Sequence, residues 1–182
     1  YSSLMAYLIL GNVLLSYGME TAFFRFITKD ANRKKVIQGT ALTALLVTTL
    51  VFFGITYMFK GPLAALLDFK EIHLIYALGI LALDALVVVP FAWFRVNEQP
   101  MRYAVIKIAN VGVNLGLNLF FFLLLPRLIA SSGLWSFVDF DDQIIYVFLA
   151  NLVASGLTLV VLLPIYTKVR LQFDVQIWKS MM

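Results

Sequence analysis

Asp84 is the ionisable residue of this sequence that most needs a chemical explanation, because it stands inside an otherwise aliphatic stretch, residues 81–86. A charge in an apolar environment such as a bilayer centre costs several kcal/mol, so it normally faces protein or water. Two interpretations stay open. Asp84 is either a cavity carboxylate that binds a proton, a cation or a polar substrate group, or a structural hydrogen-bond partner between packed helices.

A first stripe of polar side chains consists of Asn12, Ser16 and Glu20, which are four residues apart. On a helix this spacing places them along one side. Glu20 is favoured to face a polar cavity together with the stripe, and the alternative is an ion pair with a nearby cation. Arg25 lies on another face from Glu20 and is expected to extend toward the inner membrane surface.

A second stripe begins at Lys107 and continues through Asn110, Asn114 and Asn118. These asparagines either line a hydrophilic path or form hydrogen bonds between packed helices. The sequence leaves both interpretations open. A weaker set at similar spacing follows later in the chain: Asn151, Ser155 and Thr158.

Sequence signatures of catalysis and metal binding are absent. The chain has no cysteine and one histidine, His73, and no Walker motif is present. The acidic cluster Asp139, Asp141 and Asp142 lacks the remaining ligands of a calcium loop and is expected to be a solvated loop. We therefore expect no metal, no cofactor and no enzymatic activity.

The elements that must position these residues are membrane-spanning helices. The chain is 62% hydrophobic and only 13% charged, with a mean hydropathy of +0.93, whereas soluble domains are about half apolar and a quarter charged. A spanning helix needs about 20 apolar residues. The sequence predicts an all-α integral membrane protein with one membrane domain, residues 1–182. Its five expected spanning helices lie at about 4–26, 36–59, 72–94, 103–126 and 144–166.

The basic residues predict the orientation of these helices. All but three of the 14 lie in or beside the segments 27–35, 95–102 and 167–182, which positive-inside statistics assign to the cytoplasm. This orientation accounts for the net charge of +4, so the charge does not call for a nucleic-acid partner. The acidic segments 60–71 and 127–143 are expected outside, with a turn at residues 131–133 and membrane-surface contacts at Trp135 and Phe137. The tail is expected to be an interfacial amphipathic segment, and the chain a fragment of a longer protein.

Two motifs resemble a known family. The segment SYGMETAFFRF, residues 16–26, resembles the second helix of bacterial polysaccharide flippases, and PFAWFRVNEQPMRY, residues 90–103, resembles their loop between helices four and five. These flippases belong to the multidrug/oligosaccharidyl-lipid/polysaccharide exporter superfamily. The resemblance implies a MATE-like N-terminal lobe comprising helices two to six of a larger transporter that alternates access between two lobes.

The resemblance also implies a function. The chain is expected to help flip a lipid-linked oligosaccharide of the polyprenyl-pyrophosphate type across the bacterial inner membrane, for O-antigen, lipopolysaccharide or capsule synthesis. Its implied partners are this substrate, membrane lipid and a missing C-terminal lobe. Glu20 and Arg25 would lie at the inner end of helix two, and Asp84 and the asparagines would face the lobe interior. The alternatives are a multidrug or small-solute exporter, a membrane-embedded transferase, and a scaffold subunit.

Overall fold

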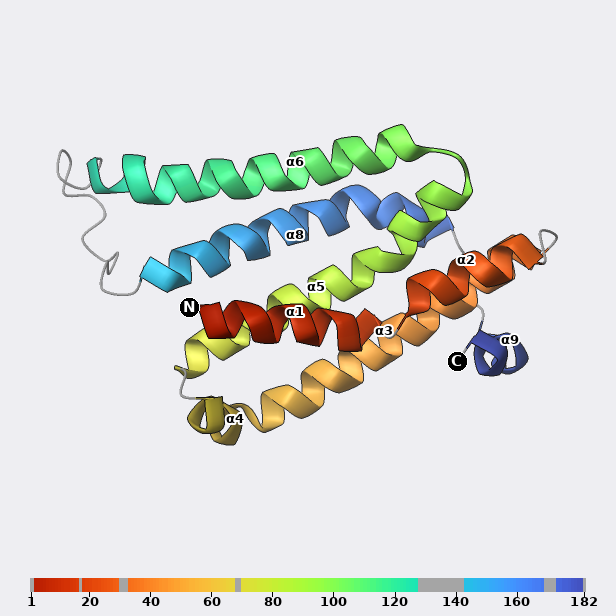
Figure 1. The fold of residues 1–182 in the computed structure, drawn as a ribbon, viewed down its shortest axis with the longest axis horizontal. Coiled ribbons are helices and arrows are strands. Elements are labelled where there is room, and N and C mark those ends of the chain that lie inside the picture. The colour runs from red at the N-terminus through yellow and green to blue at the C-terminus, as the bar shows by residue number, and fades with distance from the viewer. Residues whose placement is uncertain are drawn as a thin grey trace.

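The fold is a bundle of helices (Figure 1). The computed structural model describes residues 2–16, 18–29, 33–67, 70–127, 143–168 and 173–181, and within these ranges there is no β-strand. The predicted all-helical class is confirmed. In chain order the helices are α1 (Ser2–Ser16), α2 (Met19–Lys29), α3 (Lys34–Met58), α4 (Lys60–Leu67), α5 (Glu71–Val96), α6 (Pro100–Leu119), the π-helical turn η2 (Phe120–Leu124), α8 (Gln143–Lys168) and α9 (Val175–Met181).

Four helices in the described part of the chain are long and apolar enough to cross a membrane. They are Lys34–Met58, Glu71–Val96, Pro100–Arg127 and Ile144–Thr167. These ranges confirm the last four predicted helices, with ends that differ by a few residues. The structure is therefore compatible with a multi-pass membrane protein.

The first apolar stretch is not the continuous helix over 4–26 that its hydropathy predicts. It is divided into α1 and α2 at Gly18, whose φ of 69° lies in the left-handed region. This conformation costs an L-residue about 1–2 kcal/mol but is readily adopted by glycine. Neither α1 nor α2 reaches the length of about 20 residues that a spanning helix needs. The prediction of five continuous spanning helices is wrong at this stretch.

α5 is the central helix of the bundle. It contacts α1, α2, α3, α4, α6 and α8, and Figure 1 shows it running between the α6–α8 pair and the group formed by α1, α2 and α3. A buried cluster joins α2, α3 and the second half of α5 through Phe23, Leu42 and Val89. Since α5 touches most of the other helices, side chains along it can meet partners from several elements.

Pro90 interrupts the hydrogen bonding of α5, and Tyr166 of α8 compensates for it. Proline has no N–H, so the carbonyl of Leu86, four residues earlier, loses its helical donor. The hydroxyl of Tyr166 donates to this carbonyl instead. The interruption is thus satisfied by a neighbouring helix, as is typical of proline in membrane helices.

α6 is the least buried of the spanning helices. It has no buried residue, and large apolar side chains such as Val105, Ile108, Val111 and Leu115 are more than half exposed. A continuous apolar surface of this kind indicates contact with lipid or with further protein. On its other side α6 packs mainly against α8.

The predicted connecting segments contain two short helices. The segment 60–71 includes α4, and Lys60 forms an ion pair of 3.7 Å with Glu71 across it. The tail includes α9, whose Ile177 joins the buried cluster of α2 and α3, while the preceding Asp174 pairs with Arg33 at 3.5 Å. The tail therefore docks on the bundle. The predicted turn at 131–133, Trp135, Phe137 and the three clustered aspartates lie outside the described residues.

Candidate functional site

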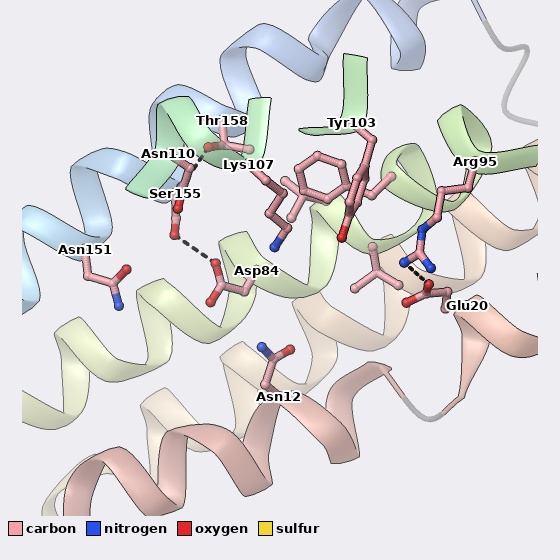
Figure 2. Close-up of a pocket in the computed structure, with 13 residues that line it drawn as sticks. Asn12, Glu20, Asp84, Arg95, Tyr103, Lys107, Asn110, Asn151, Ser155 and Thr158 are labelled. Carbon is pink, nitrogen blue, oxygen red and sulfur yellow. Dashed lines mark hydrogen bonds and ion pairs between the residues drawn. The ribbon is translucent and has the colours of Figure 1, made fainter. Parts of the chain in front are cut away.

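A polar cavity of about 220 Å³ lies between α1, α2, α5, α6 and α8 (Figure 2). Its apolar lining is limited to Val87, Val88 and Phe91 of α5. The polar lining consists of Asn12, Glu20, Asp84, Arg95, Tyr103, Lys107, Asn110, Asn151, Ser155 and Thr158. A chain this apolar therefore concentrates several of its charges and amides around one space.

The central helix α5 supplies one wall of the cavity through a single stripe. Asp84, Val88, Phe91 and Arg95 are separated by four, three and four residues. At about 100° per residue they lie within roughly 60° of one another around the helix. α5 thus places a carboxylate at the middle of its length and a cation near its C-terminal end, both facing the same space.

Asp84 is held by α8 and faces a cation from α6. The Ser155 hydroxyl donates to Asp84 Oδ1 at 2.8 Å, and Ser155 itself is buried. Figure 2 shows the Lys107 ammonium group and the Asp84 carboxylate pointing into the same space, with the Asn12 amide of α1 across from them. Lys107 Nζ lies 5.0 Å from the centre of the Phe91 ring. Within the described residues Lys107 makes no direct ion pair, and its charge acts through space on Asp84.

The end of the cavity nearest the C-terminus of α5 is bounded by an ion pair between Glu20 of α2 and Arg95 of α5. Both side chains are 39% exposed, so solvent can screen the pair and its net contribution to stability is small. The Arg95 guanidinium also lies 5.0 Å from the centre of the Tyr103 ring. This cation–π contact joins the start of α6 to the same corner of the site.

Hydrogen bonds between side chains of α6 and α8 form the wall opposite α1. Asn110 Nδ2 donates to Thr158 Oγ1 at 2.8 Å, and Asn114 Nδ2 donates to Asn151 Oδ1 at 3.1 Å. Asn118 Nδ2 in turn donates to Asn114 Oδ1 at 2.7 Å. The asparagine stripe therefore forms hydrogen bonds between packed helices, one of the two interpretations that the sequence left open. Asn110 also lines the cavity.

The structure brings together only part of the predicted site. Asn12, Glu20, Asp84 and Asn110 line the cavity. Asn114 and Asn118 lie in the hydrogen-bonded wall without lining it, and the Ser16 hydroxyl donates to the Val13 carbonyl of its own helix. Arg25 is exposed and does not line the cavity.

Sequence reasoning missed Arg95 and Tyr103 as site residues, because both were assigned to the inner loop and its flanks. The signal that could have found Arg95 is its spacing of eleven residues from Asp84, which returns to the same helix face. Tyr103 likewise precedes Lys107 by four residues. Lys107 and the set Asn151, Ser155 and Thr158 had been noted as stripes, and the structure now places all four at the cavity.

The balance of charge limits what the site can do. Two carboxylates and two cations line it, so their formal charges cancel. The described residues contain no group of three or more histidines, cysteines or carboxylates placed to hold a metal ion. The cavity offers cations for an anionic group and amide and hydroxyl groups for polar ligands. Such a lining is suited to binding.

Comparison with known proteins adds no family assignment. No protein-family model, no curated protein and no solved structure matches this chain.

Proposed function

We propose that this chain is the N-terminal, MATE-like lobe of a transporter in the bacterial inner membrane that flips a lipid-linked oligosaccharide of the polyprenyl-pyrophosphate type. The observation that carries the proposal is the polar cavity between α1, α2 and three apolar, membrane-length helices, α5, α6 and α8. A carrier of this kind must give a hydrated, anionic head group a polar environment within the bilayer. The polyprenyl tail can remain in lipid.

The cavity lining supplies the interactions that such a head group requires. Lys107 makes no direct ion pair in the described part of the chain, and the oxygens of a pyrophosphate would accept hydrogen bonds from its ammonium group. Charge-assisted hydrogen bonds to phosphate are stronger than neutral ones. The amides of Asn12 and Asn151 offer both donors and acceptors to sugar hydroxyls. Asp84 would then bind either sugar hydroxyls or the coupling ion.

The experiment is a flipping assay with the full-length protein in proteoliposomes that contain a lipid-linked oligosaccharide. We expect Asp84→Asn and Lys107→Gln each to reduce the transport rate by about tenfold or more, the effect of losing one hydrogen bond to a charged group. Lys29→Gln, which removes an exposed cation at the end of α2 outside the cavity, serves as the control. Unchanged transport by both cavity variants would overturn the proposal.

Three further measurements separate the alternatives. Export of cationic solutes that depends on Asp84, without any flipping, would favour the multidrug or small-solute exporter. Product formation from an activated sugar in purified membranes would favour the transferase. A full-length protein that assembles with other membrane proteins but moves neither class of substrate would be a scaffold subunit.

A further inference from the structure

An apolar groove runs along the α6–α8 pair and adjoins the polar cavity at Asn110 and Thr158. Two adjoining hollows of about 400 and 340 Å³ share Val105, Ile106 and Val161, and together they form the groove. Among the described residues that line the hollow of about 340 Å³, the polar side chains are those of Asn110 and Thr158, which are hydrogen-bonded to each other. We propose that this groove binds one acyl chain of an anionic phospholipid from the inner leaflet, with the lipid phosphate at Arg102.

The groove faces away from the cavity. On α6 its wall is formed by Val105, Ala109 and Val113, spaced by four residues. At about 100° per residue this face lies roughly 140° around the helix from the face that carries Tyr103 and Lys107. The groove and the proposed substrate site thus open mainly on different faces of α6, and they share the hydrogen-bonded pair Asn110 and Thr158 as a partition.

The length of the groove fits one leaflet of a bilayer. Arg102 marks its inner end and Val113 its far end, a separation of eleven residues or roughly 16 Å of helix. Half of a hydrocarbon core of about 30 Å is about 15 Å. A chain that begins at the water boundary beside Arg102 would thus end near the midplane, where the acyl chain of an inner-leaflet phospholipid also ends.

The charge at the inner end fits an anionic head group. Arg102 is exposed, and its Nη1 donates to Gln99 Oε1 at 3.1 Å. A guanidinium has five N–H donors, so this bond leaves others for a phosphate. The segment 95–102 is predicted to be cytoplasmic, and the cytoplasmic leaflet is the one enriched in anionic lipid. Shape, length and charge therefore favour the same occupant.

The test is a titration of the purified chain in detergent with phosphatidylglycerol and with phosphatidylethanolamine, followed by native mass spectrometry. We expect phosphatidylglycerol to bind about fivefold more tightly, which corresponds to about 1 kcal/mol per basic residue near the membrane surface. Arg102→Gln should remove this preference. Ala109→Phe, which fills the groove, should weaken the binding of both lipids by a similar factor.

The matched control is Ile108→Phe on the neighbouring, exposed face of α6, which should bind both lipids as the wild type does. Equal affinity of the wild type for the two lipids would overturn the proposal, and so would equal effects of Ile108→Phe and Ala109→Phe. A dimer that Ala109→Phe disrupts would instead assign the groove to a second copy of the chain. Because the readout is lipid binding, its failure is distinguishable from loss of transport.

Discussion

The break between α1 and α2 can be tested by replacing Gly18 with alanine. A Cβ at this position would meet no atom within 4 Å, so the substitution introduces no collision and acts only through the backbone. At a φ of 69° an L-residue is destabilised by about 1–2 kcal/mol. We therefore expect Gly18→Ala to lower the free energy of unfolding by about 1 kcal/mol or somewhat more.

The matched control is Gly112→Ala in α6, where a Cβ would also meet nothing within 4 Å and no left-handed φ is present. There alanine should stabilise the helix by roughly 0.5–1 kcal/mol, because it loses less conformational freedom on folding than glycine does. The same substitution is thus expected to lower the free energy of unfolding at Gly18 and to raise it at Gly112. Gly18→Asn should fall between wild type and Gly18→Ala, because asparagine adopts the left-handed conformation more readily.

The assay is thermal unfolding of the purified variants in detergent, followed by tryptophan fluorescence. A change of 1 kcal/mol shifts the melting temperature by about 2–4 °C for a chain of this size, so Gly18→Ala and Gly112→Ala should differ by about 3–8 °C. If Gly18→Ala melted at or above the wild-type temperature, the reasoning would be refuted. The first apolar stretch would then be the continuous helix that hydropathy alone predicts.

Two further outcomes are expected. Tyr166→Phe should lower the free energy of unfolding by about 1–3 kcal/mol, measured by thermal unfolding, because it leaves the Leu86 carbonyl without a donor. Adding Pro90→Ala should recover part of this loss, because it restores the backbone N–H. A double variant no more stable than Tyr166→Phe would contradict this account. Because the chain has no cysteine, single introduced cysteines can report the orientation of the helices. In intact cells a membrane-impermeant maleimide should label Lys70→Cys, whereas Lys35→Cys should be labelled only after lysis. Equal labelling of the two variants in intact cells would reject the predicted topology.

The spanning helices were largely predictable, because length and apolar composition are local properties of the sequence. The ranges of α3, α5 and α8 agree with the predicted stretches within a few residues, and so does Pro100–Arg127, which comprises α6, η2 and the three residues after it. The division at Gly18 was not predicted, because a hydropathy average does not register the backbone conformation of one residue. Glycine is also common in continuous membrane helices, so its presence alone did not indicate a break.

The candidate site was predictable only in part. Asp84 and Glu20 stood out, because charges inside apolar stretches are unfavourable unless something solvates or pairs with them. The partner that each of these carboxylates meets depends on how the helices rotate about their axes and cross one another. The residues around a carboxylate in the sequence do not reveal that arrangement. Arg95 is an instance: it falls in the predicted cytoplasmic segment 95–102, but the fold pairs it with Glu20 from another helix.

By itself, the sequence determined that this chain is helical and has segments able to cross a membrane, because apolar composition and length are sufficient for that conclusion. Only the tertiary structure decided that Glu20 meets Arg95, that Ser155 binds Asp84 and that a polar cavity forms between them. The physical reason is that these contacts join residues far apart in the chain. They depend on how each helix is bent and rotated about its axis.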